Sequence, residues 1–441
     1  MLRTAMRVLR RRLFFATLFA AACVPSALAQ DKAQKPKTQK ELDAMVREAI
    51  ELDVRRGDGR SKLDALLPTL TAVPLDAKAR ALWSKAIAER WSKGKKLESS
   101  GDHRFFPADK ATGAPARGRY LVGGETKKPK GLAIAMHGGG VGSADAGGAF
   151  SAYEAAVRQL GYVIVAPECL EATEYGWTDA GTEEFVLDLV DAALRTWKVD
   201  PDRVVFVGHS MGGYGSWALG GHHADRLAAI APSAGAPTPI HSRKGGPIVD
   251  LQDGVIPSLR NVFVAVYQST DDPQVPPEPN QFAVKKLKDS AAKWGGFAHD
   301  YWEVTGQGHG APPGGHEAHL ARIRDAVRKP VPERLVWQPV LAWKRQFSWL
   351  YWDAPKQNAV VQADLDREDN SVSITSTRDT KGLYVLLDER VLDLQKDVVV
   401  RVGGTEVFRG RPVPDLGTFV LTSLQPDKGL QFCARVPAFA K

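Results

Sequence analysis

A serine, an acid and a histidine that lie far apart in this sequence have settings in which they could together attack a carbonyl carbon. Ser210 lies in Gly208-His-Ser-Met-Gly212, between the apolar run Val204–Val207 and a second apolar stretch that starts at Tyr214. A Gly-x-Ser-x-Gly run between a strand and a helix forms a sharp turn that exposes the serine hydroxyl. The positions two before and two after the serine must be small in so tight a turn, and glycine satisfies that need. The pattern therefore predicts a nucleophile at Ser210.

A serine hydroxyl needs a general base, and the base needs an acid that orients it. In a strand–turn–helix setting of this kind, the chain order is serine, acid, histidine. Asp271 and Asp272 follow the strand-like run Val262–Tyr267, and His309 lies between two glycines further along the chain. We predict Asp272 as the acid and His309 as the base.

Other residues compete for these roles. Asp271 is the immediate neighbour of Asp272, and the rival histidines downstream are His299, His316 and His319. The Gly-His-Gly setting, typical of a flexible loop, favours His309. His209, inside the serine motif, is interpreted as structural rather than catalytic.

Acyl transfer also needs two N–H donors where negative charge develops on the carbonyl oxygen. The residue after the nucleophile, Met211, supplies one backbone donor. The second is expected from a loop that follows an earlier strand, and His137-Gly-Gly-Gly140 follows the apolar run Leu132–Met136. We predict an oxyanion hole formed by Met211, Gly139 and Gly140.

The elements that must position these residues follow from the apolar pattern. Short continuous apolar runs alternate with helical spacing, which is typical of a mostly parallel sheet covered by helices on both faces. The helical spacing is clearest from Phe185 to Trp197. The strand-like runs are 132–136, 162–166, 204–207, 227–231, 262–267 and 301–304.

Four segments together resemble a known family. VDPDRVVFVGHSMGG, MHGGG, DDPQVP and GHG are similar to segments of secreted α/β-hydrolase esterases related to poly(3-hydroxybutyrate) depolymerases and feruloyl esterases. The resemblance covers roughly residues 118–330 and implies the α/β-hydrolase fold and ester hydrolysis through an acyl-enzyme. The acid of this family lies in an Asp-x-x-Val-Pro run. Here that run is Asp272-Pro-Gln-Val-Pro276, which favours Asp272 over Asp271.

The first 29 residues have the three parts of a secretory signal peptide: a basic start with five arginines, a short apolar core and an Ala-x-Ala end at Ala29. We therefore expect an exported protein, periplasmic or secreted. Arg11-Arg12 leaves a twin-arginine export route open beside the general one. Cys23 is a weaker candidate for lipidation, because it lacks the usual leucine three residues earlier.

Changes in composition divide the remaining chain. Residues 30–40 are predicted to be a flexible leader, 41–117 a helical N-terminal segment and linker, 118–331 the α/β catalytic domain, and 332–441 a β-rich domain. Gly403-Gly404 between two strand-like runs predicts a hairpin. The aromatic run Phe347–Trp352 is either the core of this β domain or a face that binds a polymer.

Composition excludes some functions. Five of the 59 basic residues and none of the 51 acidic ones lie in residues 1–29, so the net charge falls from +8 for the whole chain to +3 after it. That charge gives no case for nucleic-acid binding. His222-His223 has no carboxylate or cysteine at ligand spacing, so no metal is predicted. The predicted triad needs no cofactor. The apolar run in residues 1–29 is too short to span a bilayer. Pairing of Cys169 with Cys433, and the oligomeric state, stay open.

The function that we predict is hydrolysis of carboxylic esters, small or polymeric, by a Ser210–His309–Asp272 triad. The first alternative is a serine peptidase of the prolyl-oligopeptidase type, which shares the turn and the triad order. Such enzymes usually carry a long β-propeller, whereas residues 41–97 have helical spacing. The second alternative is a non-catalytic binding protein on a hydrolase scaffold, since fold does not imply function.

Overall fold

The computed structural model describes residues 37–238 and 251–440. The expected signal peptide, residues 1–29, lies outside the described residues. The expected leader, residues 30–40, lies outside them up to residue 36, and a helix already begins at Gln39.

The N-terminal segment is helical, as its spacing predicts. Its helices are α1 Gln39–Glu51, α2 Gly59–Thr71 and α3 Ala77–Ser92. Helix α1 starts with a capping box, in which the Thr38 hydroxyl accepts a hydrogen bond from the backbone of Glu41 and the Glu41 carboxylate accepts one from the backbone of Thr38. Its apolar side chains recur every three or four residues, so they share one buried face. They are Leu42, Val46 and Ala49.

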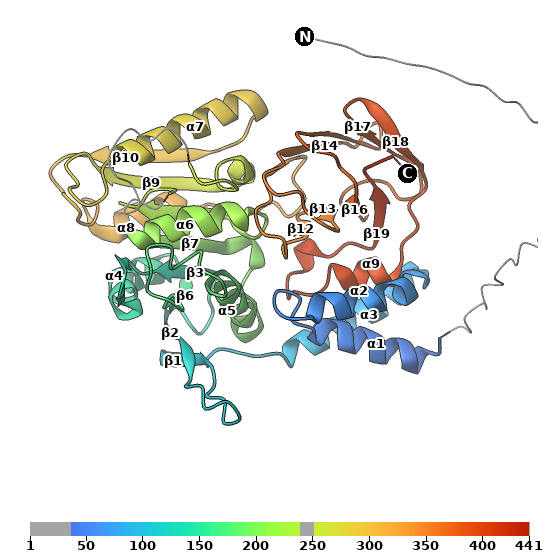
Figure 1. The fold of residues 1–441 in the computed structure, drawn as a ribbon, viewed down its shortest axis with the longest axis horizontal. Helices are drawn as coiled ribbons and strands as arrows, with labels where there is room; N and C mark the ends of the chain where they lie inside the picture. The colour runs from blue at the N-terminus through green and yellow to red at the C-terminus, as the bar shows by residue number, and fades with distance from the viewer. Residues whose placement is uncertain (1–36, 239–250, 441) are drawn as a thin grey trace, which may run out of the picture.

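A central sheet of eight strands follows, in the order β1-β2-β6-β3-β7-β8-β9-β10 (Figure 1). Strands β6 to β10 in this order are mutually parallel, and β2 runs antiparallel to β6 and to β1. This confirms the predicted fold class, a mostly parallel sheet. The strands are β1 Gly101–Phe106, β2 Arg117–Gly124, β3 Gly131–Met136, β6 Tyr162–Pro167, β7 Val204–His209, β8 Ala229–Ser233, β9 Phe263–Ser269 and β10 His299–Val304.

Helices cover both faces of this sheet, because successive side chains of a buried strand point to opposite faces. In β3, Leu132 and Ile134 pack into one apolar cluster with α5, α6 and α7, whereas Ala133 and Ala135 pack into another with α4 and α8. The helices are α4 Ala146–Gln159, α5 Thr182–Trp197, α6 Met211–His222, α7 Glu278–Trp294 and α8 Gly315–Leu320. A short hairpin, β4 Gly139–Gly140 and β5 Ser143–Ala144, follows β3.

The C-terminal region contains two further sheets. One has the strand order β11-β14-β15-β17-β18, and the other β12-β13-β16-β19. Gly403 and Gly404 join β17 to β18, as the pair predicts. The strands are β11 Arg334–Trp337, β12 Gln346–Phe347, β13 Leu350–Trp352, β14 Val361–Asp366, β15 Ser371–Ser376, β16 Leu383–Leu387, β17 Val398–Val402, β18 Thr405–Gly410 and β19 Ala434–Pro437.

The N-terminal helices pack against this C-terminal region, which itself contains a helix, α9 Leu416–Leu421 (Figure 1). The backbone N–H of Leu75 donates to Pro414 over 3.0 Å, and that of Leu416 donates to Val73 over 2.9 Å. The indole of Trp91 donates to the carbonyl of Ser423. Helices α1 to α3 and the C-terminal region therefore form one packed unit, which the sequence pattern did not predict.

The stretch expected to be a linker before the catalytic domain contains a strand of the central sheet. Strand β1 pairs antiparallel with β2, with Gly101 opposite Val122 and Phe106 opposite Arg117. Phe105 is buried in the apolar core of the central sheet, so the sheet begins well before residue 118. The stretch around β1 is rich in turn-forming residues, so its sequence predicts a linker and not a strand.

The aromatic run Phe347–Trp352 belongs to the core. Trp349 and Trp352 are 0% exposed, and Phe347 stacks on Trp337 with ring centroids 5.5 Å apart. The indoles of Trp349 and Trp352 donate to backbone carbonyls. This run therefore presents no face to a polymer.

The two cysteines in the described part of the chain are both free. Cys169 and Cys433 are buried, and each thiol has its pKa raised, to about 12 and about 11, chiefly by burial. The disulfide that the sequence left open is not formed.

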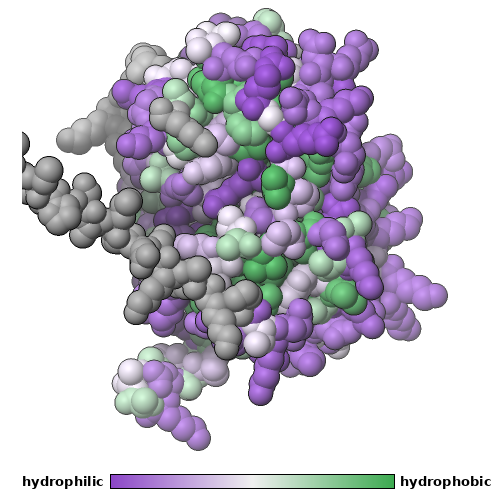
Figure 2. All heavy atoms as spheres, turned by 90° about the vertical axis from the view of Figure 1, so that its right-hand side faces the viewer, coloured by the Kyte–Doolittle hydropathy of each residue, from purple (hydrophilic) through white to green (hydrophobic). Residues whose placement is uncertain are grey.

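The molecular surface on the side of the C-terminal region is mainly hydrophilic, and its hydrophobic atoms form small separate spots (Figure 2). None of the helices in residues 37–238 and 251–440 combines the length and apolar character needed to cross a bilayer.

Candidate active site

Ser210 lies in the turn between β7 and α6, in a backbone conformation that a side chain rarely adopts, with φ 59° and ψ −125°. The turn is as tight as the sequence predicts. A Cβ added to Gly208 would lie 2.4 Å from the carbonyl oxygen of Gly212, and one added to Gly212 would lie 2.0 Å from that of Met136. Backbone bonds hold the strained residue, because its N–H donates to Ser233 over 2.9 Å.

The three residues predicted to form a triad lie within hydrogen-bond distance of one another. His309 Nε2 is 2.9 Å from Ser210 Oγ, and His309 Nδ1 is 2.7 Å from Asp272 Oδ2. The Asp272 carboxylate only accepts, so Nδ1–H donates to it and Nε2 is left to accept the Ser210 hydroxyl proton. The Asp272 side chain is 0% exposed, which shields this pair from water.

The two adjacent aspartates have different surroundings. The second oxygen of Asp272 accepts from the backbone N–H groups of Gln274 and Val275, at 2.8 and 2.9 Å. These bonds fix the carboxylate toward His309. The turn after β9 thus presents Asp272, and not Asp271, to the imidazole.

Asp271 instead binds the loop that carries the histidine. Its carboxylate accepts from the backbone of Gly306 at 2.9 Å and of Gly308 at 3.2 Å, and from the Ser269 hydroxyl. The Ser269 bond, followed by the bond from Gly306, lowers the pKa of Asp271. Asp271 is therefore a positioning residue for the loop of His309, a role that the sequence did not suggest.

His209 is a second support for this loop. Its Nε2 lies 3.1 Å from the carbonyl oxygen of His309, and its Nδ1 lies 2.9 Å from Ser233 Oγ. Burial, with a further effect of the neighbouring His309, lowers the pKa of His209 to about 4, so the ring is neutral at pH 7. A carbonyl oxygen accepts only, so Nε2–H donates to His309 and Nδ1 accepts from Ser233. The structural interpretation of His209 fits these contacts.

The rival histidines make other contacts. His299 Nδ1 lies 2.8 Å from the carbonyl of Phe297, and His319 Nε2 lies 2.9 Å from that of Ala265. The ring of His316 stacks on Tyr153 with centroids 4.0 Å apart. Of these four histidines, His309 is the one within hydrogen-bond distance of Ser210 in the described structure.

The residues predicted for the oxyanion hole line one pocket with the serine. Gly139, Gly140 and Met211 all border the small cavity at Ser210. Met211 is the first residue of α6, so its N–H has no acceptor within the helix. The backbone of Gly138 is also close, since a Cβ there would lie 3.2 Å from the Ser210 Cβ. The sequence missed Gly138, although it belongs to the same glycine run.

His137 holds this glycine loop in place. Its Nε2 accepts from the backbone N–H of Cys169 at 3.1 Å, so its Nδ1–H donates to the carbonyl of Gly138 at 2.6 Å. The Trp177 indole donates to the carbonyl of His137. Trp177 is fully buried, so it supports the loop and does not face a substrate.

A larger cavity, of about 350 Å³, lies beside the small one. Gly139 borders both cavities, and His209, Tyr153 and His316 line the larger. The site therefore offers two unequal spaces that both border Gly139.

His222 and His223 end α6 and face one buried carboxylate. Glu183 Oε1 lies 2.7 Å from His222 Nδ1 and 2.9 Å from His223 Nε2. Across residues 37–238 and 251–440, no group of three or more histidine, cysteine or acidic side chains is arranged to hold a metal ion.

Residues 133–402 match the profile of the alpha/beta hydrolase family, which is more than half of the chain. The chain belongs to the alpha/beta hydrolase family. The match starts in β3 and extends through the first strands of the C-terminal region to β17. No curated protein matches the chain.

Solved structures that resemble this hydrolase include several esterases, all at low identity. A thermostable esterase has 19% identity and a TM-score of 0.36, covering 47% of this chain and 54% of that one, so this hydrolase spans about half its length. An acetyl xylan esterase from Aspergillus awamori has 12% identity and a TM-score of 0.37, covering 51% and 99%. A ferulic acid esterase from Anaeromyces mucronatus, in complex with ferulic acid, has 15% identity and a TM-score of 0.37. The similarity covers 53% of this chain and 93% of that one.

Proposed function

We propose that this hydrolase is a serine esterase that cleaves carboxylic esters through an acyl-enzyme. The observation that carries the proposal is the hydrogen-bonded series from Asp272 through His309 to Ser210. It ends at a pocket bordered by the predicted oxyanion residues. A protein that only binds its ligand would not need these three side chains to be hydrogen-bonded in series.

The geometry supports a two-step reaction. Ser210 Oγ attacks the ester carbonyl carbon while His309 Nε2 takes its proton, and Asp272 stabilises the imidazolium. Backbone N–H groups of Met211 and the glycine loop bind the oxyanion of the tetrahedral intermediate. His309 returns the proton to the leaving alkoxide, and the C–O bond of the ester breaks. A water molecule, deprotonated by His309, then attacks the acyl-enzyme and releases the acid and free Ser210.

The size of the pocket favours short acyl groups. The cavity at Ser210 has a volume of about 40 Å³. A single water needs about 10–15 Å³ by the same measure, so an acetyl or propionyl group fills this space. We propose that the acyl group occupies it and that the alcohol part extends toward the larger cavity lined by His209 and Tyr153.

Export is also a proposal, and it rests on the sequence of residues 1–29 alone. The basic start, apolar core and Ala-x-Ala end predict cleavage after Ala29.

The deciding experiment compares initial rates on p-nitrophenyl acetate, butyrate and octanoate for the wild type and Ser210→Ala. We expect the acetate to be hydrolysed fastest, and Ser210→Ala to lower kcat/KM by at least about 10⁴-fold. Full activity of Ser210→Ala would contradict the mechanism. A preference for octanoate would contradict the assignment of the acyl pocket.

A chromogenic proline-containing peptide serves as the control substrate for the peptidase alternative. We expect no turnover of this peptide by wild-type enzyme that hydrolyses the acetate ester. Turnover of the peptide alone, together with loss of that turnover in Ser210→Ala, would assign the same triad to a peptidase.

A further inference from the structure

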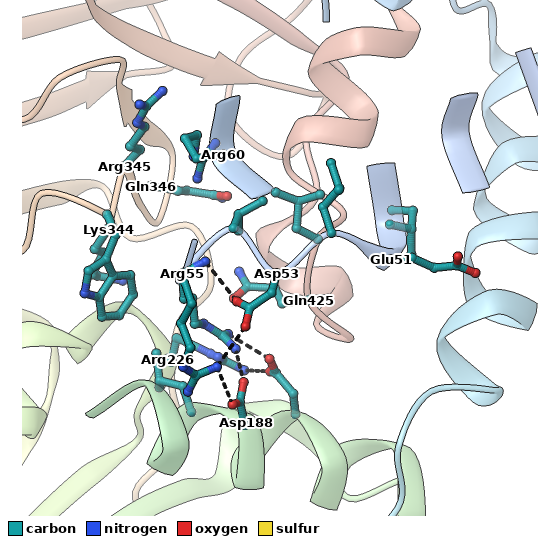
Figure 3. A pocket seen from close by; sticks show the side chains of 18 of the residues that line it. Glu51, Asp53, Arg55, Arg60, Asp188, Arg226, Lys344, Arg345, Gln346 and Gln425 are labelled. Carbon is teal, nitrogen blue, oxygen red and sulfur yellow. Dashed lines mark hydrogen bonds and ion pairs between the residues drawn. The ribbon is translucent and has the colours of Figure 1, made fainter. Parts of the chain in front are cut away.

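A cavity of about 460 Å³ lies where the N-terminal helices, the hydrolase domain and the C-terminal region meet (Figure 3). Its walls come from the loop between α1 and α2, from α5, from the segment that follows α6, and from the chain around β12 and α9. This volume lies in the range of small-molecule sites. It is far larger than the pocket at Ser210, and the proposed mechanism makes no use of it.

This cavity is separate from the triad. Ser210 precedes the first residue of α6, whereas Arg226, which lines the cavity, follows its last turn. Helix α6 has 12 residues, and at a rise of 1.5 Å per residue it extends about 18 Å. A ligand in the cavity therefore does not reach the nucleophile.

Basic side chains outnumber acidic ones in its lining, eight against five. The excess is not spread evenly. On the side of α5, Asp191 pairs with Arg55 at 2.7 Å and with Arg226 at 2.6 Å, and Asp188 pairs with Arg55 and Arg56, both at 2.8 Å. These pairs offset most of the charge there and join the α1–α2 loop to the hydrolase domain.

The opposite side carries Arg60 and Arg345, which keep buried N–H groups that no acceptor in the described residues reaches. Some arginines on the side of α5 have such groups as well. Arg60 forms no ion pair within the described residues, and its Nε and Nη1 are buried without a hydrogen-bond partner. Arg345 pairs with Asp64 at 3.1 Å through Nη1, and its Nε is also buried without a partner. Figure 3 draws it on the same side of the cavity as Arg60. Burial lowers the pKa of Arg60, and Asp64 and Asp353 only partly offset that effect.

Unmatched buried N–H groups of this kind are costly unless an acceptor reaches them. Guanidinium groups bind carboxylate and phosphate oxygens through paired N–H donors. Aromatic side chains, among them Trp343 and Tyr351, line the same cavity and offer contacts to an organic body. The lining thus matches a small molecule that combines an oxyanion group with a carbon framework.

We propose that this cavity is a binding site for a small organic anion, whose carboxylate or phosphate group is bound by Arg60 and Arg345. Because its walls come from all three parts of the chain, the bound anion stabilises their association. The site is independent of the proposed esterase activity.

The test is thermal unfolding of the whole protein with three probes: inorganic phosphate, glucose 6-phosphate and trigalacturonate. Potassium chloride at matched ionic strength is the reference. We expect at least one probe to raise the unfolding midpoint saturably, by about 3 °C or more at saturation. A rise with the phosphates alone identifies a phosphate site, and a rise with trigalacturonate alone identifies a carboxylate site.

Arg60→Gln should weaken binding of that probe at least about tenfold. In chloride its midpoint should stay at or above that of the wild type, because a buried charge without a partner is removed. Arg345→Gln should weaken binding in the same way and provides a second variant if Arg60→Gln does not fold. Arg378→Gln, an exposed arginine in the C-terminal region, makes the same charge change and should bind normally.

Ester hydrolysis by Arg60→Gln should equal that of the wild type, which separates this test from that of the triad. The proposal is overturned if none of the probes raises the midpoint beyond the chloride reference. It is also overturned if Arg60→Gln and Arg345→Gln respond to the probe as Arg378→Gln does.

Discussion

At the residue scale, two neighbouring carboxylates position one histidine, and each binds a different part of it or of its loop. Asp272 is turned inward by the backbone N–H groups of Gln274 and Val275 and accepts from His309. Asp271 is turned outward and binds the backbone of the loop on which His309 lies. One residue orients the imidazole ring, and the other orients its main chain.

Substitution of these two aspartates should therefore have unequal effects. Asp272→Asn places an amide against His309 Nδ1 and favours the wrong tautomer, so kcat/KM should fall about 10²–10⁴-fold. Asp271→Asn keeps one oxygen for the loop and should cost less than about tenfold. Initial rates on p-nitrophenyl acetate for both variants check this expectation. Equal losses would mean that the bonds of Asp271 to the loop matter as much as the contact of Asp272 with the imidazole.

At the element scale, the connection from β7 to α6 is possible only because its flanking residues lack side chains. The carbonyl oxygen of Met136, in the neighbouring strand β3, lies where a Cβ of Gly212 would be. Backbone cannot move away as the end of a flexible side chain can. The glycines therefore permit the close approach of β3, β7 and α6 that exposes Ser210.

Gly212→Ala should destabilise the fold by about 2 kcal/mol or more, since an added Cβ would lie 2.0 Å from the Met136 oxygen. Gly140→Ala is the matched control, because a Cβ there meets no atom within 4 Å. It should change stability by less than about 0.5 kcal/mol. Urea unfolding followed by far-ultraviolet circular dichroism measures both. A Gly212→Ala protein as stable as Gly140→Ala would refute the steric account.

At the scale of the whole molecule, one buried arginine links the hydrolase domain to the C-terminal region. Arg328 is 4% exposed, and it donates through Nη1 to Asp427 at 2.7 Å and through Nε to Asp202 at 2.8 Å. Asp202 precedes β7, and Asp427 follows α9. Segments more than two hundred residues apart thus meet at one guanidinium.

Removal of this arginine should weaken the whole fold. Arg328→Ala leaves the buried Asp427 without its partner, which costs about 3–5 kcal/mol. Arg367→Ala removes an exposed arginine that pairs with Glu333 at 3.4 Å, and it should cost less than about 1 kcal/mol. Denaturant unfolding of both variants gives these differences, and a loss below about 1 kcal/mol for Arg328→Ala would show that the two parts associate without it.

Helices, strands and turns could be predicted from the sequence where a short segment carries the signal, such as an apolar run or a pair of glycines. The apolar runs 132–136 and 204–207 fall within β3 and β7. The turn at Ser210 has the strand–turn–helix form that its glycines indicate. Helix α4 was missed, because its first turns contain Gly147 and Gly148, which have low helix propensity.

The sequence by itself determined the order and type of the chemical groups, because a glycine-flanked serine and the period of apolar residues are properties of short segments. Tertiary structure decided which aspartate faces His309, and that the N-terminal helices pack on α9. It also decided that Arg60 and Arg345 line one cavity. Each of these facts depends on contacts between residues far apart in the chain, and no local pattern of side chains specifies such a contact.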